Sequence, residues 1–169
     1  MIDRLESRHQ LFVSIKSEIP FLEQYVKIKI DLANISSMIR IQYFKTLDKM
    51  EDILIDGGNL DIRFYNELRG KTLEEIIPVF KNTPYNRIVD NGIRPIIQKG
   101  SFSIFEREKE NFIMNYMKLT RYVTFGVEPV VCYFVFRESD INIIKMILLG
   151  KLNGLSKQEI KERVPVSFN

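Results

Sequence analysis

The fold of this chain can be inferred from one stretch, Arg137-Glu-Ser-Asp-Ile-Asn-Ile-Ile-Lys-Met-Ile-Leu-Leu-Gly-Lys-Leu-Asn-Gly-Leu-Ser156. It follows an almost wholly apolar run, Pro129 to Phe136, so charged residues stand in the middle of a long apolar segment. Each such charge would cost about 2.5 to 3.5 kcal/mol at the centre of a bilayer, which argues against a membrane span. The segment is therefore predicted to be a buried helix of a globular protein, with Pro129 at its start and Gly150 and Gly154 at its end.

Polar residues share one side of this predicted helix. Glu138, Asn142 and Lys145 follow one another at spacings of four and three, which places them on one face. Arg137 and Asp140, three apart, are predicted to pair beside them. Inside a protein such a face must find hydrogen-bond partners. It either locks neighbouring helices together or lines a cavity that receives a partner, and the residues alone leave both interpretations open.

A second long helix with a polar stripe is predicted from Phe21 to Leu47. Its apolar face repeats at spacings of four, three and four, at Ile28, Leu32, Ile35 and Ile39. A polar stripe on another face comprises Lys27, Asp31, Asn34 and Ser37. In both helices an acid therefore lies about one turn before an asparagine, and we expect the two segments to be copies of one unit.

Each copy is expected to contain a long helix, a Gly/Asn turn and a short helix. In the first copy the turn is Asp56 to Asn59 and the short helix Asp61 to Leu68. In the second the turn is Gly150 to Gly154 and the short helix Ser156 to Val164. The predicted fold is thus all-α, with residues 1–100 forming the first helical unit together with connecting short helices, and residues 101–169 forming the second.

Further helices are indicated by caps and by the helical period. A short amphipathic helix is predicted from Asp3 to Ser17, another from Pro84 to Ile97 with interruptions near Gly92 and Pro95, and a long one from Ser103 to Phe125. Capping boxes are predicted for Thr72 with Glu75, Ser103 with Glu106 and Ser156 with Glu159. No stretch alternates apolar and polar residues for long enough to predict a sheet.

The composition excludes several functions. The 169 residues carry a net charge of +3 with acids and bases mixed throughout, which does not favour nucleic-acid binding. One cysteine, Cys132, and one histidine, His9, cannot form a zinc site of several Cys and His, and Cys132 is expected to be a core residue. Gly150-Lys151 lacks the other residues of a phosphate-binding loop, so no ATP hydrolysis is expected.

The acidic pairs Glu74-Glu75 and Glu108-Glu110 are expected on solvated surfaces. The charged N-terminus lacks the apolar core of a signal peptide, so export is not expected.

The stretch from Phe125 to Ser156 resembles the C-terminal signature of the C subunit of V/A-type rotary ATPases, which is known as the d subunit in eukaryotic V-type enzymes. In that family an acidic-Asn-basic helix precedes a Gly-Lys-Leu-x-Gly-Leu turn and a short last helix, and this chain has all three parts. A second block, Val26 to Arg40 and then Leu54 to Asp61, is similar to the family motif Asp-Leu-x-Asn-Ile-x-x-x-x-Arg before a Gly-Gly turn. The resemblance runs over nearly the whole chain and covers the C-terminal half to two-thirds of the family pattern.

The resemblance implies similar helical units arranged as a funnel around a pseudo-threefold axis. It implies a non-catalytic central-stalk adaptor that links the membrane rotor ring to the central shaft, so that ion transport is coupled to ATP. Its partners would be the shaft subunits and the rotor ring, without nucleic acid, cofactor or metal, and it would lie in the cytoplasm, peripheral to the membrane. The candidate shaft contacts or structural stripe residues are Asp31, Asn34, Arg40, Arg137, Glu138, Asp140, Asn142 and Lys145.

Two alternatives fit the residues without the resemblance. One is a generic helical scaffold for protein interaction, because long capped helices suit many such scaffolds. The other is a small enzyme that uses Glu138, Asp140 and Lys145.

Overall fold

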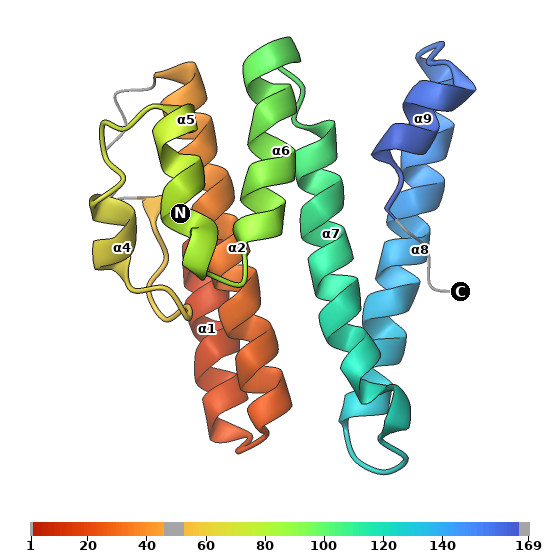
Figure 1. Cartoon of the computed structure of the whole chain (residues 1–169). Coiled ribbons are helices and arrows are strands. Elements are labelled where there is room, and N and C mark those ends of the chain that lie inside the picture. The colour runs from red at the N-terminus through yellow and green to blue at the C-terminus, as the bar shows by residue number, and fades with distance from the viewer. Residues whose placement is uncertain (1, 46–52, 166–169) are drawn as a thin grey trace. The chain divides into compact units, whose positions relative to one another are not determined.

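The computed structural model of the chain describes residues 2–45 and 53–165, and within these ranges it contains helices and no strand (Figure 1). The predicted all-α class is confirmed. In chain order the elements are α1 (Ile2–Lys16), α2 (Pro20–Phe44), α4 (Ile62–Asn66), α5 (Leu73–Ile76), the 3-10 helix η1 (Ile77–Asn82), α6 (Asn86–Lys99), α7 (Ser103–Lys118), the 3-10 helix η2 (Leu119–Tyr122), α8 (Glu128–Leu152) and α9 (Lys157–Arg163).

The chain divides into two compact units, Met1–Asn82 and Thr83–Asn169, which are described separately below as unit 1 and unit 2. The sequence division at residue 100 would separate α6 from α7. In the structure these two helices pack together, because Gly92 of α6 lies against Phe105 of α7. The packing therefore places α6 in unit 2. That the chain contains two copies of one helical unit stays a prediction.

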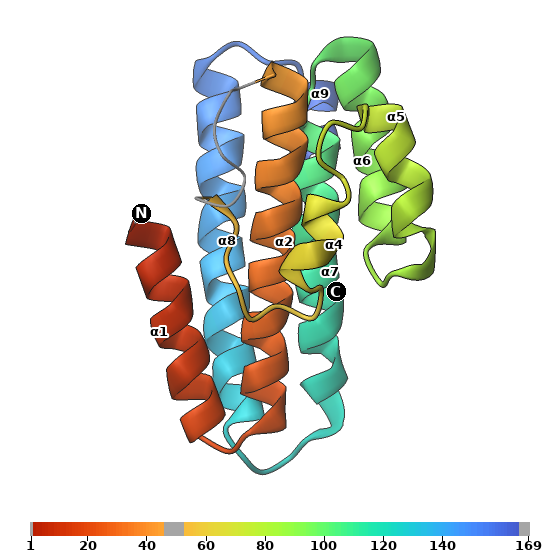
Figure 2. The ribbon, with the colours of Figure 1, turned by 90° about the vertical axis from the view of Figure 1, so that its left-hand side faces the viewer.

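Unit 1 is built on the hairpin of α1 and α2, seen side by side in Figures 1 and 2. Helix α2 begins with Pro20, where a missing backbone N–H costs nothing, and ends at Lys45 in a left-handed conformation. The predicted end at Leu47 lies outside the described residues. The predicted apolar face of α2 is confirmed, since Ile28, Leu32, Ile35 and Ile39 are all buried. Leu11 of α1 packs against the core residues Val26, Ile30 and Ile55, as does Ala33 of α2.

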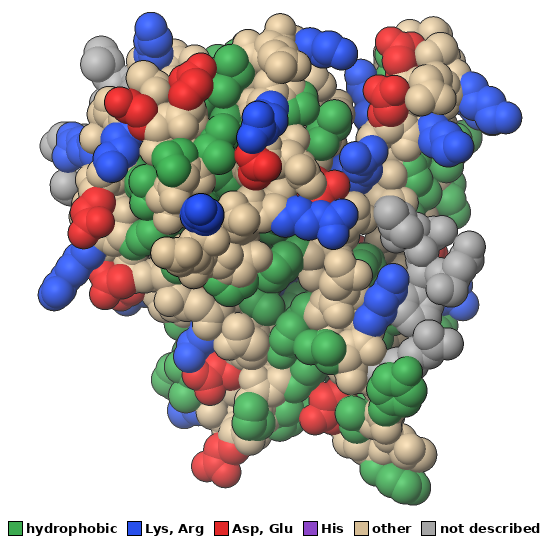
Figure 3. All heavy atoms as spheres, viewed as in Figure 1, with side chains coloured by type: hydrophobic (Ala, Val, Ile, Leu, Met, Phe, Trp, Pro, Cys, Tyr) green, Lys and Arg blue, Asp and Glu red, His purple; other side chains and the backbone are tan. Residues whose placement is uncertain are grey.

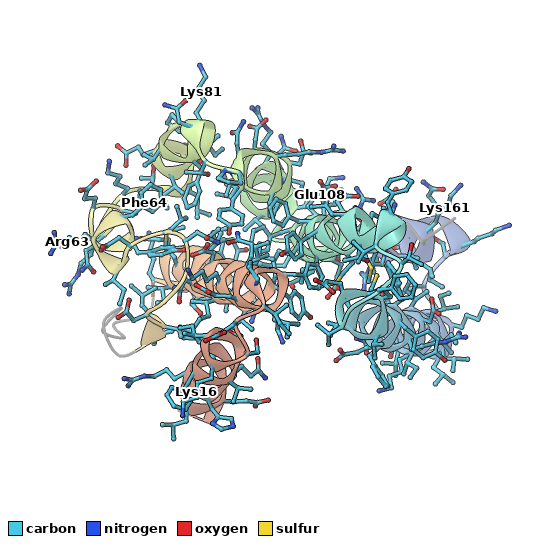
Figure 4. The ribbon with its side chains drawn as sticks, turned by 90° about the horizontal axis from the view of Figure 1, so that it is seen from below. Lys16, Arg63, Phe64, Lys81, Glu108 and Lys161 are labelled. Carbon is cyan, nitrogen blue, oxygen red and sulfur yellow. The ribbon has the colours of Figure 1, made fainter. Side chains whose placement is uncertain are left out.

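Two short helices of unit 1 are held by caps and aromatic packing. Asp61 accepts a hydrogen bond from the Arg63 amide at 2.7 Å and so caps α4. The capping box of Thr72 and Glu75 at the start of α5 is confirmed, and hydrogen bonding to Thr72 lowers the pKa of Glu75. Phe64 of α4, labelled in Figure 4, meets Phe80 of η1 edge-on with ring centroids 5.1 Å apart.

In unit 2, α6 runs without a break through both residues that were predicted to interrupt it. Gly92 is buried where α6 approaches α7 most closely, and a Cβ there would lie 2.6 Å from Phe105 Cδ2 and 2.9 Å from Phe105 Cα. Pro95 lies near the end of the helix, which continues to Gly100 in a left-handed C-cap. The glycine therefore serves close packing, and the predicted interruption is wrong.

Helix α7 is shorter than predicted and starts differently. Its N-cap is Phe102 and no side chain caps it, so the predicted capping box of Ser103 and Glu106 is wrong. The α-helix ends at Lys118 and tightens into η2, where the Thr120 hydroxyl donates to the Met117 carbonyl at 2.8 Å. That bond favours the tighter turn over continuation to Phe125.

Helix α8 matches its predicted position but not its predicted burial. Among its residues only Cys132, Ser139 and Gly150 are buried, and many of its large apolar side chains are exposed. Gly150 lies inside the helix, where Ile160 of α9 packs so closely that a Cβ would come within 2.8 Å of Ile160 Cγ1. Helix α9 begins at the predicted capping box of Ser156 and Glu159, which is confirmed.

Replacing Gly92 by alanine is expected to destabilise the protein, although alanine is about 1 kcal/mol better than glycine in a helix interior. The new Cβ would overlap the backbone of Phe105. The penalty for overpacking, roughly 1 to 3 kcal/mol, should exceed the propensity gain. Urea denaturation checks this, with the exposed neighbour Asn91→Ala as the control that should not lose stability. Equal stability of both variants would contradict the close packing of α6 on α7.

Candidate functional site

The polar stripe of α2 is buried and fully engaged. Asp31 has no exposed surface, and its carboxylate accepts hydrogen bonds from the amides of Asn59 at 2.9 Å and Leu60 at 3.1 Å. The Tyr65 hydroxyl donates weakly to the same carboxylate and to the Asp31 carbonyl, at 3.5 and 3.4 Å. The buried side chain of Asp31 thus receives hydrogen bonds from the turn and from α4, as a buried polar group requires.

Asn34 completes this arrangement one turn further along α2. Its side chain donates to the Ile55 carbonyl and accepts from the Ile55 amide, both at 2.8 Å, so both backbone groups of Ile55 pair with a single amide. Asn34 is 1% exposed. Because Ile55 lies in the core with Val26 and Ile30, its backbone has no access to water and depends on this asparagine.

The glycines of the turn allow α2 to approach it. Gly57 adopts φ +99°, a conformation that side chains disfavour, and a Cβ there would collide with Leu11 Cδ2. At Gly58 a Cβ would collide with Asp31 Oδ1, so any side chain would displace the carboxylate. Asp31, Asn34 and the Gly57-Gly58 turn therefore form one unit, called here the α2 lock. Its geometry supports the structural interpretation of this stripe.

The polar stripe of α8 is different, because Arg137, Glu138, Asp140, Asn142 and Lys145 are all exposed. The predicted pair of Arg137 and Asp140 is present, with 3.6 Å between Arg137 Nη1 and Asp140 Oδ2. The Arg137 guanidinium also lies 5.3 Å from the centre of the Tyr133 ring. The expectation that this face is buried is wrong for the described structure. No turn is folded against this face of α8 in the described structure, so its polar side chains are open to solvent. On α2, Arg40 is likewise exposed.

Two grooves beside α8 include residues of its stripe. One, of about 360 Å³, lies between α8 and α9 and is lined by Asn142, Lys145, Met146 and Arg163 among others. The second, of about 470 Å³, adds α7 and is lined by Glu106, Arg107, Glu110, Asn142 and Arg163 among others. Asn142 and Arg163 therefore border both grooves, so the middle of α8 is a mixed-charge concave surface of unit 2.

The carboxylates of α7 are less solvated than the sequence predicted. Glu108, labelled in Figure 4, is buried, with 3.5 Å between its Oε2 and Arg87 Nε and 3.7 Å between its Oε1 and Arg107 Nη2. Burial raises the pKa of Glu110. The negative charges of Glu106 and Glu138 also raise this pKa, while the positive charge of Lys109 lowers it. The expectation of a solvated acidic pair is wrong here, whereas Glu74 and Glu75 are exposed as predicted. The helical spacing that puts Glu108 toward α6 was the signal that could have found it.

The described residues include no group of three or more His, Cys, Asp or Glu that could hold a metal ion. Cys132 is buried, as predicted, with its thiol 3.4 Å from the Met117 carbonyl. On the face of the molecule seen in Figure 3, basic and acidic side chains alternate in both units and gather into no single-sign patch. None of the described helices is long and apolar enough to cross a membrane.

The described fold is all-helical, with the polar stripe of α2 buried in packing and the polar stripe of α8 exposed. The family described as "ATP synthase (C/AC39) subunit" matches residues 8–163 of this chain. The chain belongs to this family.

Curated relatives agree with the family. The C subunit of an A-type ATP synthase from Methanocaldococcus jannaschii is 26% identical over 141 residues, which cover 82% of this chain and 35% of the relative. Proteins of the same name from Halorubrum lacusprofundi (23% identical, 86% and 42% covered) and Thermococcus onnurineus (25% identical, 85% and 38% covered) are also similar. The chain thus spans less than half the length of these relatives. No solved structure matches significantly.

The α2 lock makes the two asparagines unequal. Asn34→Leu should strand both backbone groups of Ile55, at about 1 to 3 kcal/mol for each buried unsatisfied group. Asn142→Leu, on the exposed face, should leave stability nearly unchanged. Thermal or urea denaturation of the two variants side by side measures the difference. A loss of the same size in both would show that Asn142 is buried in solution.

Glu110 should make stability depend on pH. Because its pKa is raised on folding, the folded chain binds this proton more tightly, and its contribution to stability falls as the pH rises from about 4.3, the ordinary glutamate value, through the raised pKa. The stability of Glu110→Gln relative to the wild type should therefore increase from pH 4 to pH 7. Denaturation at both pH values tests this, with the exposed Glu74→Gln as the control for loss of a carboxylate. A gain no larger than that of the control would contradict the burial of Glu110.

Proposed function

We propose that this chain is a non-catalytic adaptor of a V/A-type ATPase or ATP synthase, which joins the membrane rotor ring to the central shaft. The family match over residues 8–163 carries this proposal, because relatives in the family are named as the C subunits of A-type ATP synthases. In this role the chain lies in the cytoplasm, peripheral to the membrane, and couples ion transport to ATP through torque alone.

The physical requirement of such a part is stiffness. A helix pair that transmits torque must not slide, and the α2 lock fixes the turn after α2 through four hydrogen bonds from two buried side chains. The close contacts of Gly92 with Phe105 and of Gly150 with Ile160 similarly fix the helix pairs of unit 2. These features support a mechanical role and involve no reacting group.

The two stripes divide the work in this proposal. Asp31 and Asn34 are buried and hydrogen-bonded within the α2 lock, so they stabilise the fold of unit 1. Arg137, Glu138, Asp140, Asn142 and Lys145 stand exposed on α8 and carry both signs of charge. A mixed-charge face with adjoining grooves suits a charged helical partner, because complementary charges fix register and suppress wrong partners. We assign the α8 stripe as the contact with the central shaft.

The test is co-purification of the chain with the shaft subunits and with the rotor ring. Reversing three charges on α8, with Arg137→Glu, Glu138→Lys and Lys145→Glu, should weaken shaft binding about tenfold or more, as loss of charge complementarity does at interfaces. Helical content, followed by circular dichroism, should not change, because all three side chains are exposed.

A matched control reverses three exposed charges away from the stripe, Lys99→Glu, Lys161→Glu and Glu74→Lys, with the same change in net charge. This control should bind the shaft like the wild type. Equal weakening in both triple variants would remove α8 as the contact face. If the wild-type chain binds neither shaft nor ring, the adaptor role itself is wrong.

A further inference from the structure

The turn between α8 and α9, two helices labelled in Figure 1, contains the dipeptide Asn153-Gly154. In such a dipeptide the backbone nitrogen of the glycine can attack the asparagine side chain, because glycine has no Cβ to hinder the approach. The chain contains one other asparagine followed by glycine, Asn91-Gly92 in α6. The two sites have the same reacting groups, so the structure around each decides which of them reacts in the folded chain.

Asn153 stands in solvent at the end of α8. It is the C-cap residue of the helix, and its side-chain amide donates to the Leu149 carbonyl at 2.8 Å. Asn153 and Gly154 are both exposed. Water therefore reaches the side chain and the backbone amide on which the reaction depends.

The backbone of Gly154 is held by few contacts. Its N–H donates to the Lys151 carbonyl at 3.1 Å, and the next amide, that of Leu155, donates to the Gly150 carbonyl at 2.9 Å. Gly154 has φ +71°, and apart from its chain neighbours nothing lies within 4 Å of the position that a Cβ would take. The Gly154 nitrogen can therefore leave its carbonyl partner when only the end of α8 opens, and helix ends open at low cost in free energy.

The backbone at Asn91-Gly92 is held much more firmly. The side chain of Asn91 is exposed, but the dipeptide lies inside α6, and Gly92 is buried. A Cβ on Gly92 would lie 2.6 Å from Phe105 Cδ2 and 2.9 Å from Phe105 Cα, so the backbone has no room to turn beside α7. The Gly92 nitrogen becomes available only when the middle of α6 unfolds and leaves α7.

We propose that Asn153 is a site of spontaneous deamidation and that the fold protects Asn91 from the same reaction. The Gly154 nitrogen gives its proton to a base in solvent and attacks Asn153 Cγ. The bond from Cγ to Nδ2 then breaks, and the nitrogen takes up a proton and leaves as ammonia. Water opens the resulting cyclic imide at either carbonyl, which gives aspartate or isoaspartate. The net reaction consumes water and releases ammonia, without an oxidant or a reductant.

The reaction would change the charge of a groove in unit 2. Asn153 lines the groove between α8 and α9 together with Lys145 and Arg163, so a neutral amide becomes a carboxylate on a surface that also holds two basic residues. The carboxylate can no longer donate to the Leu149 carbonyl, and a negative charge at the C-terminal end of a helix is unfavourable. In the isoaspartate product the main chain is also longer by a carbon atom at the turn that joins α8 to α9.

Incubation of the folded chain at neutral to weakly alkaline pH, followed by peptide mass spectrometry, tests the proposal. Trypsin places the two sites in separate peptides, residues 152–157 and residues 88–99. The mass gain of aspartate over asparagine should accumulate at Asn153 about tenfold or more faster than at Asn91, because opening a helix end costs less than unfolding a packed helix interior. The product at Asn153 should separate into two isomers of equal mass, aspartate and isoaspartate.

Two controls isolate the effect of the fold. In urea, which removes the structure around both sites, their rates should differ much less than in the folded chain. Asn153→Gln keeps a carboxamide but lengthens the side chain, so it should abolish the mass gain in the peptide of residues 152–157. The same variant should leave the rate at Asn91 unchanged.

Equal rates at the two sites in the folded chain would overturn the proposal, as would a faster reaction at Asn91. It would also be overturned if Asn153 stayed intact in the folded chain while both sites reacted in urea, or if neither site reacted in urea. These measurements use this chain alone, so they are independent of the binding to shaft and rotor ring that tests the proposed function.

Discussion

The pairing of two buried side chains of α2 with the backbone of a glycine turn is the interaction on which unit 1 depends. Asp31 and Asn34 together serve the amides of Ile55, Asn59 and Leu60 and the carbonyl of Ile55. A loop that contributes a core residue such as Ile55 must satisfy its backbone internally. Here a helix does so through its side chains, so the helix, the turn and the core are interdependent.

Glycine has a specific part in this arrangement and in its counterparts in unit 2. Gly58 admits the Asp31 carboxylate, Gly92 admits Phe105, and Gly150 admits Ile160. In each case the missing Cβ sets how closely two elements approach, and only one of the three lies in a turn. Helical glycines that shorten the distance between helices are compatible with an unbroken helix, and this is what α6 and α8 show.

Sequence reasoning recovered the helical elements well, because their signals are local. Proline at the start of α2 and α8, the capping boxes of Thr72 and Ser156, and the apolar period of α2 all depend on residues within a turn or two. The capping signal at the start of α7 was misleading. Ser103 has the residues of a cap but does not act as one, since the helix begins at Ser103 itself, one residue earlier than that role requires.

The stripes show the same limit more clearly. Asp31 with Asn34 and Glu138 with Asn142 have similar spacings, so the period of the helix predicts a polar face in both cases. Whether such a face is buried depends on which other segment folds over it. The helical period of the polar residues carries no information about that segment. On α2 a Gly-Gly turn covers the stripe, whereas the segment after α8 leads into α9, which packs at Gly150 near the end of the helix. The difference could not be read from either helix by itself.

The contact between Cys132 and Met117 has a practical consequence. Cys132 is the only thiol in the chain, and it is buried where the first turns of α8 meet the end of α7. A thiol reagent can reach it only when the two helices separate there. The rate of alkylation therefore measures how often this helix pair opens locally, and it needs no engineered label.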